Sequence, residues 1–350
     1  MKFRQTSEGK DNAAEKMKDR IRASLIDTGA AAVGFARADE VEPSVTENFH
    51  NWIEEGCHAG MEYLNRHLTL RQHTDSVLPG ARTVISLAYS YYPLNWRAEG
   101  MSSIAAYAYG EDYHTVLRET LHPVVKTLQK EYGGKWRICI DSAPVAERYW
   151  ALKSGIGKGG KNGCVIIDGC GSFSFLVEIL TTLEIPSDSA SDEVCENCGR
   201  CLEVCPTGAL RQDGTLDARR CINYLTIEKK GDFTQEEEKL IVMHEGYLFG
   251  CDKCLRVCPH NSNSDKKAPN LFSSKREILE LTPEEMIKTD PENFRKHFGQ
   301  TPLNYAGIEK LQRNARTLLK NKLETNDFQP LSLSRGDKIR TCDHTPPRRC

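Results

Sequence analysis

Cysteine is the residue type whose spacing in this chain most clearly predicts chemistry. The chain has 350 residues and 14 cysteines, and one run reads Cys195-x2-Cys198-x2-Cys201-x3-Cys205-Pro206. A second run reads Cys251-x2-Cys254-x3-Cys258-Pro259, with Cys221 between the two runs. This spacing is typical of bacterial ferredoxins, in which three thiolates hold one cubane cluster and the fourth binds the other cluster. The eight cysteines therefore predict two [4Fe-4S] clusters.

The ferredoxin pattern also predicts which cysteines share a cluster. One set is Cys195, Cys198, Cys201 and Cys258, and the other is Cys205, Cys221, Cys251 and Cys254. Two structural zinc sites are the alternative, because tetrahedral thiolate sites hold either zinc or iron–sulfur. The C-x2-C-x2-C-x3-C-P spacing favours iron–sulfur over zinc. The remaining cysteines lack such spacing: Cys57, Cys139, Cys164, Cys170, and Cys342 and Cys350 in the basic tail.

Composition predicts a cytoplasmic protein that neither crosses nor binds a membrane. No apolar run reaches the roughly 18 residues of a membrane span, and the first 30 residues mix both charges without a secretory signal. Thiols stay reduced in the cytoplasm, where clustered cysteines indicate metal ligands rather than disulfides. The net charge of −2 gives no global basic field that would attract nucleic acid.

The elements expected around the cysteines divide the chain into parts. Apolar periodicity predicts helices over 12–28, 113–132 and 146–153, and buried strands over 31–36, 83–91 and 136–140. Their alternation predicts an α/β or α+β domain with a central sheet. The predicted parts are a catalytic domain (12–185), a ferredoxin-like domain (186–265), a helical segment (266–322) and a disordered tail (323–350). An electron carrier needs only the cysteine module, so the 185 preceding residues favour an enzyme that consumes the electrons.

Several motifs in order resemble the epoxyqueuosine reductase family. They span residues 17–322 and include HAGMEYLNRH (58–67), YAYGEDYH (107–114), IDSAPVAER (140–148), GIGKGGKN (155–162), GSFSFLVE (171–178) and YLFGCDKC (247–254). The chain is similar to the short form of the family, without C-terminal helical repeats.

The resemblance implies a reaction and its participants. The N-terminal domain would bind base-off cobalamin, which receives electrons from the clusters and reduces epoxyqueuosine to queuosine at the wobble position of tRNA. Asp141 would be the proton donor, and a ferredoxin or flavodoxin would supply electrons to a monomer. A reductive dehalogenase, which uses the same cofactor pair, is one alternative. A non-enzymatic electron carrier or cobalamin-binding protein is another.

The resemblance also implies a set of contact residues. Candidate cobalamin contacts are Arg66, Asp141, Lys161, Asn162, Val165 and Leu176, with Cys251 and Asp252 between cofactor and cluster. Tyr107, Asp112, Tyr113 and His114 are expected on the substrate side. Candidate phosphate contacts for tRNA are Lys229, Lys230, Arg276, Arg295, Lys296, Lys310, Arg313 and Arg316.

Asp141 has two interpretations from the residues alone. It follows a predicted strand, where ligands of α/β sheets bind, and desolvation there would raise its pKa toward that of a general acid. It could instead cap a helix that begins near Pro144. The resemblance favours the first interpretation.

Two positions depart from the family pattern. Lys158 stands where the family has tryptophan, and Val177 stands where it has glycine. Both are expected beside the cofactor, where the glycines of 155–163 would let the backbone approach a bulky ligand.

Overall fold

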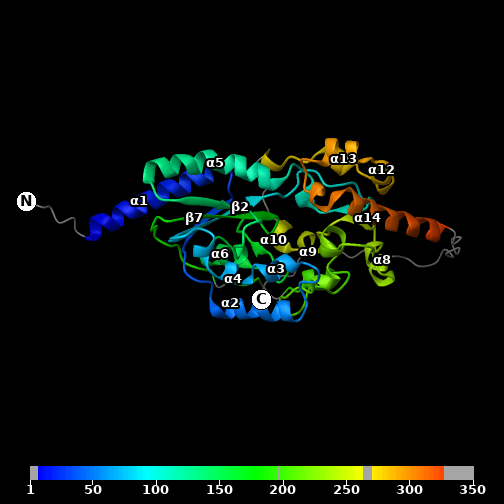
Figure 1. The fold of residues 1–350 in the computed structure, drawn as a ribbon, viewed down its shortest axis with the longest axis horizontal. Helices are drawn as coiled ribbons and strands as arrows, with labels where there is room; N and C mark the ends of the chain where they lie inside the picture. Colours follow the sequence, from blue (N-terminus) through cyan, green and yellow to red (C-terminus); the bar gives the residue numbers. More distant parts are fainter. Residues whose placement is uncertain (1–6, 192, 196–197, 263–269, 327–350) are drawn as a thin grey trace, which may run out of the picture.

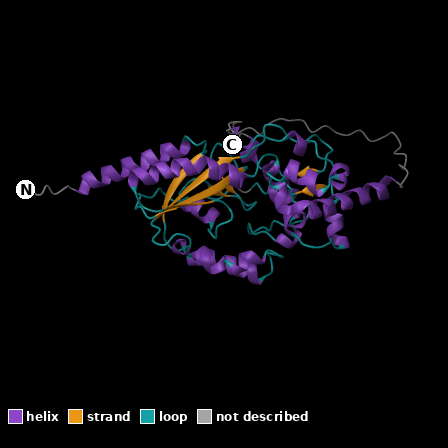
Figure 2. Cartoon of the chain, turned by 45° about the horizontal axis from the view of Figure 1, so that its top comes forward, coloured by secondary structure: helices purple, strands orange, loops and turns teal. Residues whose placement is uncertain are grey.

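Two groups of elements lie side by side in the protein (Figure 1). The computed structural model describes residues 7–191, 193–195, 198–262 and 270–326. A sheet with helices on both faces makes up one group, and the cysteine loops with the C-terminal helices make up the other (Figure 2). Within the described residues, no helix combines the length and the apolar character needed to cross a bilayer.

The central sheet has the strand order β1-β2-β7-β4, and each neighbouring pair is antiparallel. The strands are β1 (Ala32–Arg37), β2 (Thr83–Ser90), β4 (Trp136–Cys139) and β7 (Ser174–Thr181). β2 and β7 occupy the centre and are largely buried on both faces, which explains why most of their residues are apolar. The mixed helix-and-strand fold is confirmed. β4 is an edge strand and half exposed, so the prediction that 136–140 is a buried strand is wrong.

Two long helices cover one face of the sheet and a short helix covers the other. α1 (Ser7–Ile26) and α5 (Tyr113–Tyr132) lie together above the sheet in Figure 1. α5 begins where Asp112 accepts the backbone N–H of His114, and its leucines pack against the odd-numbered residues of β2 and β7. α6 (Glu147–Lys153) packs on the opposite face through Trp150.

Shorter elements surround the cysteine loops. On the side of the sheet domain these are α2 (Pro43–Glu54), α3 (Glu62–Arg66), α4 (Leu68–Gln72), β5 (Lys158–Gly159) and β6 (Val165–Ile166). On the cysteine side these are α7 (Arg200–Val204), a π-helix (Tyr224–Glu228), α8 (Gln235–Ile241), β8 (Tyr247–Phe249), α9 (Lys253–Arg256) and α10 (Pro259–Ser262). β8 pairs in parallel with β3 (Ser103–Ile104), and this pairing ties the cysteine module to the sheet domain.

The C-terminal part is helical, as predicted. It contains α11 (Arg276–Leu279), α12 (Pro283–Lys288), α13 (Pro291–Phe298) and α14 (Leu303–Asn326). α14 packs against the π-helix and β8 through Leu311 and Ala315. Because α14 continues to Asn326, the tail predicted to begin at 323 starts inside a helix. Residues 327–350, with Cys342 and Cys350, lie outside the described residues, and the predicted domain boundaries stay a prediction.

Candidate functional site

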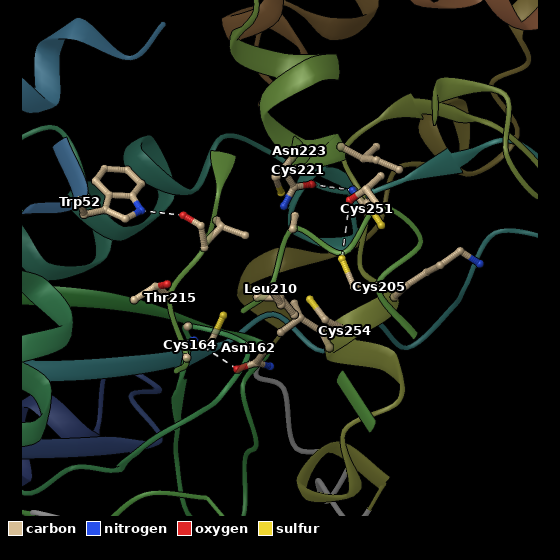
Figure 3. Close-up of a pocket in the computed structure, with 18 of the residues that line it drawn as sticks. Trp52, Asn162, Cys164, Cys205, Leu210, Thr215, Cys221, Asn223, Cys251 and Cys254 are labelled. Atoms are coloured by element: carbon tan, nitrogen blue, oxygen red, sulfur yellow. Dashed lines mark hydrogen bonds between the residues drawn. The ribbon is translucent and has the colours of Figure 1, made fainter. Parts of the chain in front are cut away.

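Four of the predicted ligands converge on one cavity. The thiols of Cys205, Cys221, Cys251 and Cys254 line a cavity of about 550 Å³ (Figure 3). Burial raises the pKa of the Cys251 thiol to about 12, and the nearby Cys221 and Cys205 add to this effect. These four cysteines are one of the two predicted cluster sets, and Cys164 lines the same cavity.

The other four predicted ligands also lie near one another. Burial raises the pKa of Cys201, and the neighbouring thiols of Cys195 and Cys198 raise it further. The pKa of Cys258 is raised by burial and by the same two thiols. Cys258 therefore joins the first run across 57 residues of sequence, as the crossed pattern predicts.

Cys164 lies between the two sets, a placement that sequence reasoning missed. Burial raises the pKa of Cys164, and the nearby thiols of Cys258 and Cys201, from one set, raise it further. Among the thiols near Cys254, which belongs to the other set, Cys164 raises the pKa of Cys254 the most. The spacing of Cys164 in the sequence gave no signal for this position.

Backbone hydrogen bonds hold the loop that carries Cys251. The side-chain amide oxygen of Asn223 accepts the backbone N–H of Cys251 at 2.6 Å, as drawn in Figure 3. Thr226 Oγ1 accepts the backbone N–H of Gly250 at 2.8 Å. Since Thr226 belongs to the π-helix that follows Cys221 and Asn223 is its N-cap residue, this segment fixes Cys221 and Cys251 relative to each other.

Asp141 lies among three polar side chains contributed by α5 and its N-cap. The Tyr113 hydroxyl donates to Asp141 Oδ2 at 2.9 Å, and His114 Nε2 lies 3.4 Å from the same oxygen. His114 Nδ1 lies 2.8 Å from Asp112 Oδ1. The Asp141 side chain is 61% exposed and its backbone has φ 54°, an uncommon conformation for a residue other than glycine.

The charge state of Asp141 differs from the sequence prediction. Its pKa is lowered, because the hydrogen bond from His114 outweighs burial and the Tyr113 hydroxyl adds to the effect. Burial alone would lower the pKa of His114, but its bonds with Asp112 and Asp141 raise it to about 9. At neutral pH the pair is therefore a carboxylate and an imidazolium.

The helix-cap interpretation of Asp141 is wrong. α6 begins at Glu147, with Ala146 at the N-cap position and no side-chain cap bond. The argument from the strand end also fails, because β4 is an antiparallel edge strand rather than a strand of a parallel α/β sheet. What places Asp141 is contact with the first turn of α5, where Tyr113 and His114 lie 28 and 27 residues before it in the sequence.

Glu147 is a second carboxyl at this site, and sequence reasoning missed it. Its Oε1 accepts the backbone N–H of Asp141 at 2.7 Å. Burial raises the pKa of Glu147 to about 7, and the charge of Asp141 raises it as well. The available signal was its place in IDSAPVAER, six residues after Asp141.

The predicted cobalamin contacts fall in several places. Asn162 and Cys251 line the cavity, and Asp252 is buried beside it, where burial raises its pKa to about 6. Lys161 reaches the other thiol set, because its backbone N–H donates to Cys195 Sγ at 3.2 Å. The structure does not bring the remaining contacts into this cavity: Val165 and Leu176 pack in a buried cluster with Ala88 and Ile156, and Arg66 is exposed at the end of α3.

Part of the cavity lining is an apolar wall. It is formed by Phe49, Trp52, Met61 and Leu64, and the Trp52 indole donates to the Leu216 carbonyl at 2.6 Å (Figure 3). A volume of this size, with an apolar wall and few polar groups, fits the class of pockets that hold cofactors.

The glycine loop and the two family departures serve packing. A Cβ at Gly157 would lie 2.6 Å from the Ile166 carbonyl oxygen, so this glycine permits the β5–β6 hairpin rather than a ligand's approach. Lys158 lies in β5 and is half-buried. Val177 is fully buried in the core beneath α1 and α5, so the expectation that it lies beside the cofactor is wrong.

Several of the predicted phosphate contacts are tied to the protein itself. Arg313 is 8% exposed and donates to the carbonyls of Leu225, Lys229 and Gly231. Lys310 donates to the Ile227 carbonyl at 2.7 Å. Arg313 is therefore a structural residue, which its helical spacing in the sequence did not reveal.

Comparison with known proteins bears on both halves of the chain. Residues 194–261 match the family described as 4Fe-4S double cluster binding domain. Residues 71–142 match the family described as Epoxyqueuosine reductase QueG, DUF1730.

Relatives match over most of their length. The epoxyqueuosine reductase of Cyclobacterium marinum is 36% identical over 304 residues, which cover 86% of this chain and 96% of the relative. An epoxyqueuosine reductase solved with an epoxyqueuosine-modified tRNA stem loop has a TM-score of 0.78 and 27% identity, covering 87% of this chain and 81% of the other. The Bacillus subtilis enzyme, solved with an aspartate-bearing catalytic loop swung out of the active site, has a TM-score of 0.79 and 26% identity, covering 87% and 82%. The chain therefore belongs to the epoxyqueuosine reductase family of oxidoreductases.

Proposed function

We propose that this chain reduces epoxyqueuosine to queuosine at the wobble position of tRNA, with electrons passing through two [4Fe-4S] clusters to base-off cobalamin. The observation that carries the proposal is a cavity lined both by apolar side chains and by Cys205, Cys221, Cys251 and Cys254. Among the relatives, one is described in complex with the modified tRNA stem loop.

Each cluster has its own set of four thiolates. Cys195, Cys198, Cys201 and Cys258 hold one cluster, and Cys205, Cys221, Cys251 and Cys254 hold the other. Short loops and the hydrogen bonds to Asn223 and Thr226 hold the backbone that carries Cys251 of the second set. Four thiolates in each set is the ligand number of a cubane.

We place cobalamin against the apolar side of this same cavity, next to the cluster that the second set would hold. Asn162 offers an amide for hydrogen bonding, and Phe49, Trp52, Met61 and Leu64 offer an apolar surface. When bound, cobalamin supplies a strongly reducing metal centre for opening the epoxide. Arg66, Lys161, Val165 and Leu176 lie away from this cavity or face other groups, so we assign the cofactor contacts to the residues that line it.

Asp141 is the proton donor to the substrate. The oxygen leaves the epoxide as water, so both of its C–O bonds break and two O–H bonds form, which consumes two electrons and two protons. His114, protonated at neutral pH, shares its proton with Asp141 Oδ2, and Tyr113 orients that oxygen. Because Asp141 lies on an exposed loop, it can present the proton to a substrate as large as tRNA.

The remaining participants follow from this reaction. A small ferredoxin or flavodoxin supplies the electrons one at a time, and the enzyme works as a monomer in the cytoplasm. Exposed cations such as Lys230, Arg295 and Lys296 remain available for phosphate contacts, unlike Arg313.

An anaerobic assay tests the function. The reconstituted enzyme, with cobalamin and a strong reductant, is given tRNA from cells blocked at epoxyqueuosine, and nucleosides are measured by mass spectrometry. Conversion to queuosine is expected. Bound iron and cobalamin without any conversion would contradict the substrate assignment and leave a dehalogenase-like enzyme or an electron carrier as the alternatives.

A further inference from the structure

Strand β7 carries a buried carboxyl that the proposed reaction does not yet use. Glu178 is 0% exposed, and neither of its carboxyl oxygens has a hydrogen-bond partner among the described residues. Its neighbours in register are Ser86 on β2 and Cys139 on β4. All the other residues of β7 between Phe175 and Leu180 are apolar, so Glu178 interrupts a hydrophobic strand.

Glu178 shares its face of the sheet with other unpartnered polar groups. Ser86 lies directly opposite it, and the Ser86 hydroxyl also lacks a partner in the described part of the chain. The Trp150 indole N–H on α6 is likewise without an acceptor there, and Trp150 packs on Val84 and Leu180 of the same face. Three orphaned polar groups on one buried face are costly unless a water links them, and buried waters occupy such sites.

This buried face connects to the active site through Glu147. Glu147 begins α6, which packs on β7 and β2, and its charge adds to burial in raising the pKa of Glu178 well above the ordinary value. Glu147 in turn accepts the backbone N–H of Asp141. The acidic residues Glu178, Glu147 and Asp141 are thus neighbours in a row from the core to the exposed loop, with Glu147 bonded to the Asp141 backbone.

Other charged groups near this row lie on the Glu147 side. Arg71 on α4 and Arg148 on α6 act on Glu147 and favour its ionised form. Besides Glu147, the titratable group near Glu178 among the described residues is the Cys139 thiol, whose pKa burial raises to about 12. Both Glu178 and Cys139 therefore stay neutral at physiological pH, whereas Glu147 can change its charge.

We propose that Glu147 stores the second proton of the epoxide reduction. After that proton leaves, Glu178 donates a hydrogen bond to the Glu147 carboxylate through a water molecule that Ser86 also binds. This inference rests on the proposed function, because it assigns a source to the second of the two protons. The first passes from His114 to Asp141 and on to the substrate oxygen. The second passes from Glu147 to the emptied Asp141 carboxylate, and no further oxidant or reductant is needed. Glu178 is a positioning residue in this scheme, since it touches no substrate.

Two measurements on the same variants test the proposal. The first is the infrared carboxyl band of Glu147, followed against pH in the protein without substrate and identified by its loss in Glu147→Gln. The second is the single-turnover rate of pre-reduced enzyme across the same pH range. The variants are Glu147→Gln, Glu178→Gln and Glu178→Met, with Glu184→Gln as an exposed control that follows β7.

The expected results separate a proton store from a purely structural role. Glu147→Gln keeps the acceptor for the Asp141 N–H but should slow turnover by about 10²-fold, the lower end for a lost proton donor. Glu178→Met removes the donor to the Glu147 carboxylate, so the midpoint of the Glu147 band and of the rate should move to higher pH. Glu178→Gln retains an N–H donor and should keep both midpoints near the wild-type value. An apolar side chain of similar shape is tolerated in place of an unsatisfied carboxyl, so Glu178→Met should not lower the unfolding temperature.

Midpoints that stay at the wild-type pH in Glu178→Met, or a full rate in Glu147→Gln, would overturn the inference and leave the proposed function intact. If wild-type enzyme makes no queuosine, the proposed function fails instead, and the infrared titration still reports on the carboxyl pair. If Glu178→Met does not fold, Ser86→Ala removes the water's partner and should move the midpoint in the same direction.

Discussion

Replacing Arg313 should destabilise the protein without weakening its grip on tRNA. The guanidinium donates to the carbonyls of Lys229 at 2.9 Å, Gly231 at 2.6 Å and Leu225 at 2.9 Å, and it stacks on the Phe233 ring at 4.0 Å. A hydrogen bond from a charged donor contributes about 1.5–3 kcal/mol, and contributions that share one donor do not add fully. Arg313→Met leaves three carbonyls without their donor, and since an unsatisfied buried acceptor costs about 1–3 kcal/mol and the costs do not add fully, we expect a loss of about 3–5 kcal/mol.

Urea unfolding of the metal-loaded protein measures this loss as a lower midpoint at an unchanged slope. Arg316→Met, an exposed position on the same helix, should stay within about 0.5 kcal/mol of wild type. A phosphate contact would instead reduce the salt dependence of tRNA binding by about one unit of slope. A stable Arg313→Met protein with a reduced salt slope would refute the structural assignment.

Two further predictions concern His114 and the thiol sets. Because the folded pKa of His114 is about 9, above its ordinary value of about 6.5, protonated His114 stabilises the fold fully below pH about 6.5. That contribution is lost as the pH rises through about 9. The difference in unfolding midpoint between wild type and His114→Gln should therefore close over this range. Curves of midpoint against pH that stay parallel for the two proteins would contradict this prediction. Cys254→Ser should lower bound iron from about eight to about four atoms per chain by removing one cluster, whereas Cys164→Ser should retain about eight. Equal iron in the two variants would overturn the assignment of Cys254 as a ligand.

The sequence predicted those elements whose formation depends on a local pattern of residues. β2 and β7 are mostly apolar because both faces of the sheet are covered, and the apolar periodicity of α5 marked the full helix from Tyr113 to Tyr132. The cysteine spacing is also a local signal, since three ligands of one set lie within seven residues. These features needed no knowledge of tertiary contacts.

The environment of Asp141 could not be predicted in the same way. Its low pKa depends on His114 and Tyr113, which reach it only because α5 crosses the sheet next to the end of β4. The expectation of a raised pKa assumed a buried strand end, whereas the Asp141 side chain is largely exposed. Tertiary contact, rather than the motif, decides the charge of this group.

Arg313 and Glu178 show two kinds of missed residue. Arg313 has the spacing of a surface cation, and only the fold reveals the carbonyls that hold it. Glu178 gave a signal that could have been used, because a glutamate inside the run SFLVEILT must be buried if the strand is central. A charged residue in such a strand predicts either a partner or a function.

The measurement that tests the central claim most directly is the single-turnover conversion of epoxyqueuosine tRNA by pre-reduced Asp141→Asn enzyme beside wild type. Asparagine keeps the size of the side chain but cannot donate the acid proton. We expect wild type to form queuosine and Asp141→Asn to be slower by about 10²–10⁴-fold, with iron and cobalamin content and tRNA affinity unchanged. Equal rates would remove Asp141 from the reaction, and the absence of queuosine with both proteins would contradict the assignment of the chain as a tRNA reductase.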